Sequence, residues 1–187
     1  MDKALIVVDY TFDFIADEGR LTCGRPGQEI DAYIAKQIEA FVEANEIVVF
    51  AVDVHEEGDL FHPETKLFPP HNIRGTSGRD LFGQVGQVFA KLTADGLPHN
   101  VRYLDKTRYS AFAGTDLEIF LRSHGVNEVH LVGVCTDICV LHTAVDAYNK
   151  GFHVVIHEAG VASFSEVGHT FALGHFKDVI GAHIIGK

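Results

Sequence analysis

The sequence predicts an α/β protein in which helices cover both faces of a parallel β-sheet. Short runs rich in Val and Ile alternate along the chain with segments of helical periodicity. Such runs are typical of strands that are buried on both faces of a sheet. Strands that alternate with helices imply right-handed crossover connections and a three-layer α/β/α architecture.

Four segments fit buried strands, and two weaker segments are added to them. The four are continuous apolar runs: Ala4–Val8, Ile47–Val52, Val129–Val134 and His153–Ile156. The weaker candidates are Val101–Leu104 and His183–Ile185.

Helices and one long irregular segment lie between these strands. Apolar residues recur at helical spacing through Gln28–Ala44, which predicts an amphipathic helix. Thr115 and Glu118 have the spacing of a capping box that opens a helix over Asp116–Ser123. The segment Asp53–Gly86 contains three prolines and three histidines. A long irregular segment inside a compact domain is usually functional.

Length and charge limit the classes of function. The 187 residues predict a single domain spanning residues 1–187. Lys and Arg number 15 against 26 Asp and Glu, a net charge of −11, so we expect neither a nucleic-acid surface nor a polybasic membrane patch. No apolar run approaches the roughly 18 residues of a membrane span. Asp9 and Asp13 interrupt the first apolar stretch, unlike a secretory signal, and three cysteines form no disulfide framework, so we expect a cytoplasmic protein.

Chemically active side chains stand at the carboxyl ends of four predicted strands. Ligands bind at these ends in open parallel sheets. The residues at these ends are Asp9, Asp53 followed by His55, Lys106, and the stretch from Cys135 to Cys139.

Cys139 is the candidate nucleophile. If Thr136 is the N-cap of a helix that runs to Lys150, with Gly151 just beyond its end, Cys139 is the third helical residue. The helix dipole and a nearby lysine would then lower the pKa of the thiol. Two alternatives stay open: Cys139 is a small buried apolar residue, or Cys135 and Cys139 form a metal pair.

Asp9 and Lys106 are candidates for proton transfer and charge stabilisation. Apolar surroundings should raise the pKa of Asp9, which suits a general base. The alternatives are a turn carboxylate at Asp9 and a solvated surface lysine at Lys106.

A metal site is predicted where the second strand ends. Asp53 and His55 share one face of an extended chain because they are two residues apart. Further ligands are available in the loop that follows: Asp59, His62, Glu64 and His71. A carboxylate with two imidazoles suits Zn²⁺, Mn²⁺ or Fe²⁺. Chance clustering in a chain with 12 histidines is the alternative.

Taken in order, these residues resemble the isochorismatase-like cysteine hydrolases over nearly the whole chain. The matching positions are Asp9 with Asp13 and Phe14, then Asp53, His55 and His71, then Lys106, and finally the stretch from Gly133 to Val140. The loop from Phe61 to His71 is similar to that of the bacterial nicotinamidase (pyrazinamidase) branch in particular.

The resemblance implies a role for each catalytic position. Cys139 would be the nucleophile, Asp9 the general base and acid, and Lys106 the cation beside both. The Val134–Cys135 peptide would be cis and would direct the amides of Cys135 and Cys139 at an oxyanion.

The resemblance also implies a fold, a cofactor and a substrate. The fold would be a Rossmann-like, six-stranded parallel sheet of order 3-2-1-4-5-6. Asp53, His55 and His71 would hold a divalent transition metal, most simply Zn²⁺, with Glu64 as the fourth ligand directly or through water. The residues that would wall an aromatic substrate are Phe14, Leu21, Phe68 and Tyr109. A homo-oligomer would hydrolyse nicotinamide, and pyrazinamide as a further candidate substrate, in NAD salvage.

Three rival functions are distinguishable from the sequence. A related amidase for carbamoyl or ureido substrates would generally lack the His-rich metal loop. An isochorismatase-type ether hydrolase would not use the thiol of Cys139. A non-catalytic binding module on the same fold would have an unreactive Cys139.

Overall fold

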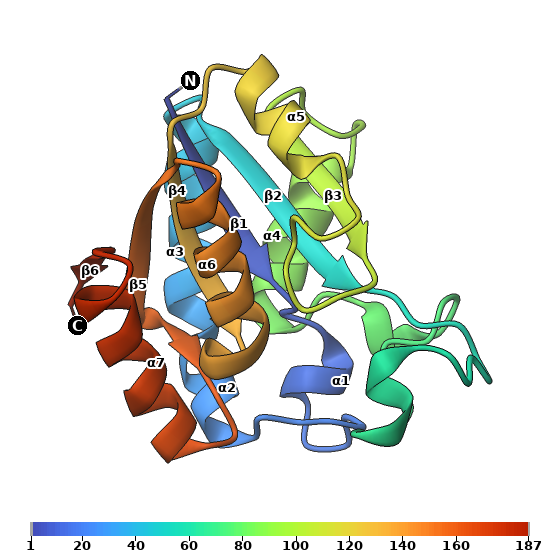
Figure 1. Cartoon of the computed structure of the whole chain (residues 1–187). Helices are drawn as coiled ribbons and strands as arrows, with labels where there is room; N and C mark the ends of the chain where they lie inside the picture. The colour runs from blue at the N-terminus through green and yellow to red at the C-terminus, as the bar shows by residue number, and fades with distance from the viewer. Residues whose placement is uncertain (1, 187) are drawn as a thin grey trace.

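The centre of the molecule is a six-stranded parallel sheet, seen in a computed structural model that describes residues 2–186 (Figure 1). The strands lie in the order β3-β2-β1-β4-β5-β6, which confirms the expected fold class and order. They are β1 (Lys3–Val8), β2 (Ile47–Asp53), β3 (Val101–Lys106), β4 (Glu128–Val134), β5 (His153–Ala162) and β6 (His183–Ile185). Because β3 and β6 are the edge strands and are partly exposed, their sequences carry the weaker apolar signal.

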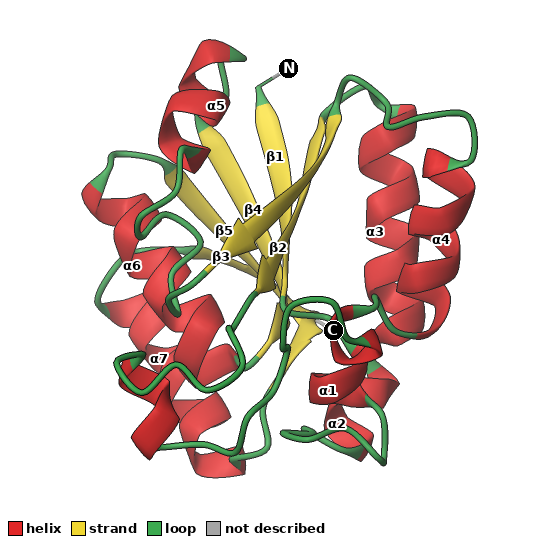
Figure 2. Cartoon of the chain, turned by 90° about the vertical axis from the view of Figure 1, so that its right-hand side faces the viewer, coloured by secondary structure: helices red, strands yellow, loops and turns green. Residues whose placement is uncertain are grey.

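Two groups of helices cover the two faces of the sheet (Figure 2). On one side lie α3 (Asp31–Glu43) and α4 (Gly83–Thr93), and on the other α5 (Leu117–Ser123), α6 (Leu141–Asn149) and α7 (Glu166–Asp178). None of the helices within residues 2–186 combines the length and apolarity that a membrane crossing requires.

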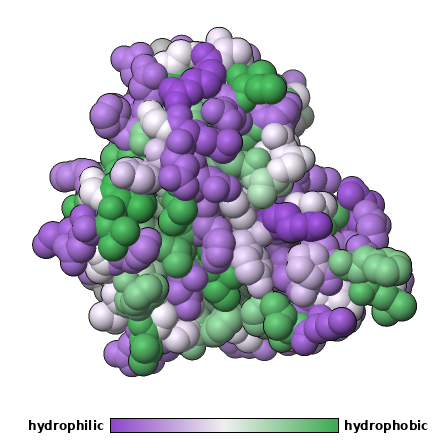
Figure 3. All heavy atoms as spheres, in the orientation of Figure 1, coloured by the Kyte–Doolittle hydropathy of each residue, from purple (hydrophilic) through white to green (hydrophobic). Residues whose placement is uncertain are grey.

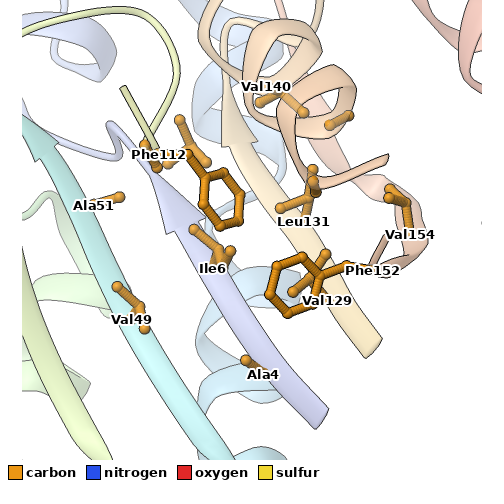
Figure 4. Packing of buried hydrophobic residues seen from close by; sticks show 14 of the residues in the cluster. Ala4, Ile6, Val49, Ala51, Phe112, Val129, Leu131, Val140, Phe152 and Val154 are labelled. Atoms are coloured by element: carbon orange, nitrogen blue, oxygen red, sulfur yellow. The ribbon is translucent and has the colours of Figure 1, made fainter. Parts of the chain in front are cut away.

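The central strands supply both halves of the core. On β1, Leu5 and Val7 pack with the residues of α3, whereas Ala4 and Ile6 belong to the cluster that includes α5, α6 and α7 (Figure 4). Both faces of the strand therefore remove apolar area from water, worth about 1.5–3 kcal/mol for each large side chain. This two-sided burial is the reason that the strand is a continuous apolar run.

The prediction of one helix over Gln28–Ala44 is wrong, because the structure has two helices there. A short α2 (Arg25–Glu29) precedes α3, and Ile30 separates them. The side chain of Asp31 accepts the N–H groups of Gln84 (2.8 Å) and Val85 (3.2 Å). This contact ties the start of α3 to the start of α4.

The predicted capping box at the start of α5 is also absent. The helix begins at Leu117, after Asp116, and the Thr115 hydroxyl accepts the N–H of Leu117 at 3.3 Å. The same hydroxyl donates to the carbonyl of Ala111 at 2.6 Å. Thr115 therefore stabilises the turn before the helix and does not cap its third residue.

The helix that carries Cys139 begins differently from the prediction. Cys135 precedes one turn of π-helix, η3 (Thr136–Val140), which continues into α6. The Cys135 carbonyl accepts the N–H groups of Ile138 (3.0 Å) and Val140 (3.2 Å), and this widens the turn. Thr136 is thus the first helical residue, and Cys139 is the fourth.

A buried pair of histidines links β4 to β5 away from the strand ends. Nε2 of His130 lies 2.9 Å from Glu128, its Nδ1 lies 2.8 Å from Nε2 of His157, and Nδ1 of His157 lies 2.9 Å from the Tyr33 hydroxyl. Every group is satisfied when Tyr33, His157 and His130 each donate one hydrogen along this chain and both imidazoles are neutral. Burial, and then repulsion from a protonated His130, lowers the pKa of His157 to about 4.

We expect this pair to make the fold less stable in acid. The unfolded state binds a proton at His157 below about pH 6.5, whereas the folded state resists it down to about pH 4. The free energy of unfolding should therefore fall across this window, by about 3 kcal/mol at most. Urea unfolding at a series of pH values measures the slope, which His157→Asn should reduce and His153→Asn, at an exposed position of the same strand, should leave unchanged. A His157→Asn variant with the wild-type slope would contradict this account.

Candidate active site

The proposed catalytic residues meet at the carboxyl edge of the sheet, beside α1 (Phe12–Ile15) at the lower right of Figure 1. Asp9 follows β1, Lys106 ends β3, and Cys139 lies in η3 just after β4. Parallel pairing places Lys106 directly opposite Asp53 of β2. The structure thus brings together four side chains from four strand ends.

Lys106 is the centre of this group. Its side chain is fully buried, and its Nζ lies 2.7 Å from Oδ2 of Asp9, 2.5 Å from Oδ1 of Asp53 and 3.7 Å from Sγ of Cys139. Although burial alone lowers the pKa of Lys106, the carboxylates of Asp53 and Asp9 raise it well above its ordinary value. Lys106 is therefore a fixed cation and not a solvated surface lysine.

Asp9 is held in a conformation that directs its carboxyl group into the cluster. Its φ is +52°, a left-handed value that a non-glycine residue rarely adopts. Oδ1 accepts the N–H of Asp53 at 2.7 Å. Burial, followed by the charge of Asp53, raises the pKa of Asp9 to about 6, and Lys106 opposes this shift. A carboxyl group with this pKa can exchange a proton near neutral pH.

The expectation of a lowered pKa at Cys139 is wrong. The side chain is 4% exposed, and burial raises the pKa of the thiol well above its ordinary value even though Lys106 lowers it. Desolvation of the thiolate and its repulsion by the carboxylates of Asp9 and Asp53 together outweigh the attraction of the cation. Cys139 is therefore a thiol at rest, and it needs a base before it can attack.

A second group of side chains shares Asp53 with the first. One ligand atom from each of Asp53, His55, Glu64 and His71 lies within 4.8 Å of the others, and all four residues are buried. Nε2 of His55 lies 3.5 Å and Nε2 of His71 lies 3.9 Å from Oδ2 of Asp53. Nε2 of His71 lies 3.7 Å from Oε2 of Glu64. The His55–Asp53 contact is a long hydrogen bond, and the two separations that involve His71 exceed hydrogen-bond lengths, which leaves a space between the four atoms.

The chemistry of these donors fits a divalent transition metal. Nδ1 of His71 donates to the Pro69 carbonyl at 2.8 Å, so its buried Nε2 holds a lone pair that has no hydrogen-bond partner within residues 2–186. Burial, and then the charge of Asp53, raises the pKa of Glu64 to about 7. A cation between the four residues would satisfy the lone pair and offset the repulsion between the carboxylates.

Two of the further candidate ligands lie outside this group. The Asp59 carboxylate accepts the N–H of Phe61 at 2.8 Å and so stabilises a turn. His62 lies 2.8 Å from the Thr107 carbonyl through Nε2, and its Nδ1 accepts the N–H of Glu64 at 3.2 Å. Both ring nitrogens of His62 are used, so it supports Glu64 without facing the metal site.

The loop after β2, which carries Glu64 and His71, projects at the right of Figure 1. It contains the short helix η1 (Pro63–Lys66). Figure 3 shows an apolar patch on this projection. The loop residues Leu60 and Phe61 are 74% and 96% exposed. Phe68, on the same loop, instead lines a cavity beside Cys139.

A small cavity beside Cys139, with room for about one water molecule, is lined by all four expected substrate-binding residues. They are Phe14, Leu21, Phe68 and Tyr109, and the cavity also contacts Glu64, Cys135, Ile138, Cys139 and Phe164. The Val134–Cys135 peptide next to it is cis, as the resemblance implied. Sequence reasoning missed Ile138 and Phe164. Phe164 was detectable in principle, because it follows the end of β5, but the predicted strand stopped six residues too early.

The fold and this site define an isochorismatase-family hydrolase. The sequence matches the isochorismatase domain over residues 3–186, so the chain belongs to that family.

Bacterial nicotinamidases are among its relatives. A Bacillus subtilis (strain 168) protein, named as an uncharacterized isochorismatase family protein PncA, is 56% identical over 184 residues, which cover 98% of this chain and 99% of that protein. The crystal structure of nicotinamidase/pyrazinamidase PncA from B. subtilis has a TM-score of 0.94 at 57% identity, covering 98% and 99% of the two chains. A Streptococcus mutans UA159 pyrazinamidase/nicotinamidase has a TM-score of 0.94 at 52% identity, covering 98% and 100%.

A more distant relative has been solved with a metal. The structure of a Pyrococcus horikoshii pyrazinamidase in complex with zinc has a TM-score of 0.85 at 29% identity, and the alignment covers 100% of both chains.

We expect metal content to depend on His71. His71→Ala should weaken Zn²⁺ binding by more than about 100-fold, because losing a ligand costs more than the 10–100-fold typical of an outer partner. The matched control is His153→Asn, an exposed histidine of β5 outside the group of four ligands, which should bind Zn²⁺ as the wild type does. Elemental analysis after dialysis measures occupancy, and full occupancy in His71→Ala would remove this residue from the site.

Proposed function

We propose that the chain hydrolyses nicotinamide to nicotinate and ammonia through a thioester on Cys139. The observation that carries this proposal is the buried contact of one cation, Lys106, with the carboxylate of Asp9 and the thiol of Cys139. An aromatic-lined cavity beside the thiol and the nicotinamidase relatives support the choice of substrate.

In the first half-reaction Asp9 takes the proton from Sγ of Cys139, and the thiolate attacks the carboxamide carbon. Both carboxylate and thiol face Lys106, which stabilises the negative charge as it moves from Asp9 to sulfur. We assign the amides of Cys135 and Cys139 to the oxyanion that forms. A donor in this role is worth about 3–4 kcal/mol in other enzymes.

When the carbon–nitrogen bond breaks, protonated Asp9 gives its proton to the departing nitrogen, which leaves as ammonia. Asp9, again a carboxylate, then accepts a proton from water as its oxygen attacks the thioester. Cleavage of the carbon–sulfur bond releases nicotinate, and the proton on Asp9 returns to Cys139. One carboxyl group with a pKa of about 6 can serve every one of these transfers.

Asp53, His55, His71 and Glu64 would hold Zn²⁺, with Mn²⁺ or Fe²⁺ as alternatives. When bound, this metal supplies a Lewis-acidic position for the pyridine nitrogen, which orients the ring. Phe14 and Phe68 connect the cavity with the proposed metal site. Each lines the cavity and packs its ring against His71, with centroid distances of 5.2 and 6.4 Å. The His-rich group also disfavours the carbamoyl and ureido amidases, which generally lack it.

We further propose that this reaction serves NAD salvage in the cytoplasm and that the enzyme is a homo-oligomer. Nicotinate is a pyridine carboxylate from which the nicotinamide ring of NAD can be rebuilt. Pyrazinamide, which differs by one ring nitrogen, is a second candidate substrate, as the names of the relatives suggest.

Trapping the acyl intermediate tests the proposal. Acid quenching during turnover of nicotinamide should leave a nicotinoyl adduct on the tryptic peptide 123–150, and Cys139→Ala should abolish both the adduct and ammonia release. Cys135→Ala should keep most activity, because we assign only the backbone amide of Cys135 a role. An active Cys139→Ala variant together with an inactive Cys135→Ala variant would overturn the assignment of the nucleophile.

A further inference from the structure

Asp13 is a buried carboxylate for which the proposed reaction has no use. It lies on α1 and is 4% exposed. Oδ2 accepts the N–H of Asn72 at 2.7 Å, and Oδ1 accepts the N–H of Arg20 at 3.3 Å. Within residues 2–186 no Lys, Arg or His side chain forms an ion pair with it. A buried charge whose partners are backbone amides, with no ion pair, is costly to desolvate.

The main amide partner of Asp13 belongs to the backbone that joins the two imidazoles. Asn72 directly follows His71, and its carbonyl accepts the N–H of His55 at 3.1 Å. The next residue, Ile73, forms a parallel bridge with His55. The position of Asn72 therefore sets where His71 lies relative to His55, and the two rings are 4.5 Å apart.

Other residues at the start of α1 hold the same segment. Asn72 has a left-handed φ of +45°, and its Oδ1 accepts the hydroxyl hydrogen of Thr11 at 3.0 Å. The Phe14 ring packs edge-on against His71. Three residues, Thr11, Asp13 and Phe14, therefore contact His71 or Asn72 and restrict their positions.

The carboxylate of Asp13 is also packed closely against the backbone of Gly78. A Cβ atom added to Gly78 would lie 2.1 Å from Oδ2 of Asp13, so the backbone of the loop closes directly over the oxygen. The carboxylate therefore lies against the backbone of Gly78 as well as that of Asn72.

We propose that Asp13 is a positioning residue for the metal centre. Through the Asn72 amide it fixes His71 against His55, and its uncompensated negative charge favours a cation at the neighbouring ligands. This inference rests on the metal site of the proposed function and adds a residue that touches neither metal nor substrate.

Asp13→Asn is the most direct variant. The side-chain shape is kept, but the charge is lost and an amide offers only one acceptor oxygen to the two N–H donors of Asn72 and Arg20. One donor must then face an NH₂ group. The loop should shift, and His71 should no longer be held at the correct distance from His55.

Asp31→Asn is a matched control. Asp31 also accepts two backbone N–H groups from a distant segment, Gln84 and Val85, and it also lies against a glycine, with a Cβ on Gly83 2.4 Å from its Oδ2. It contacts none of the four metal ligands. Both variants should lower the melting temperature of the metal-free protein, so stability alone does not separate them.

The measurement is Zn²⁺ affinity by competition with a chromophoric chelator, together with the visible spectrum of the Co²⁺-substituted protein. Asp13→Asn should bind Zn²⁺ about 10–100-fold more weakly than wild type and should change the Co²⁺ spectrum. Asp31→Asn should match wild type in both. Wild-type affinity and spectrum in Asp13→Asn, or an equal loss in Asp31→Asn, would overturn the proposal.

A milder variant covers the case in which Asp13→Asn does not fold. Thr11→Val keeps its volume but removes the hydroxyl that Asn72 accepts, and it should weaken Zn²⁺ binding about 2- to 10-fold, the equivalent of one hydrogen bond. Unchanged affinity there would contradict the role of the Asn72 anchor. A wild-type protein that binds none of Zn²⁺, Mn²⁺ and Fe²⁺ would overturn the metal site itself, whereas the thioester experiment is independent of it.

Discussion

The site depends on the burial of one lysine between two carboxylates. Two aspartates so close together would repel each other strongly in the interior, and neither has water to screen its charge. Lys106 offsets this repulsion because its ammonium group contacts both Asp9 and Asp53. The two carboxylates nevertheless differ: burial raises the pKa of both, but Lys106 and His55 lower that of Asp53 to about 2, while that of Asp9 remains near 6. One is a permanent anion and the other can exchange a proton.

Asp53 joins the two halves of the site because its two oxygens have separate partners. Oδ1 contacts Lys106, and Oδ2 faces His55 and His71. Asp9, Asp53 and Cys139 also lie close enough together to hold a metal ion. The ammonium group of Lys106 already occupies the position between them, so these three residues have no need of a metal. A cation at one oxygen and a lysine at the other would fix the position of the candidate metal site relative to Cys139.

The sequence predicted the sheet well because its strands are buried on both faces, and the strand-end rule found Asp9, Lys106 and Cys139. It failed where three-dimensional packing decides. The helix dipole suggested a thiolate at Cys139, but the degree of burial, which one sequence does not reveal, reverses the shift. Phe164 was missed because β5 continues through less apolar residues than a strand signal requires.

The effect of Lys106 on the proton of Asp9 can be measured in metal-free protein. The carboxylic-acid C=O stretch in infrared difference spectra, assigned by its loss in Asp9→Asn, reports this proton as the pH is varied. Asp9 should titrate near pH 6 in the wild type and at a higher pH in Lys106→Met, because removing the cation removes the main influence that lowers its pKa. A wild-type Asp9 that remains ionised well below its ordinary pKa, or a titration that Lys106→Met leaves unchanged, would contradict this account.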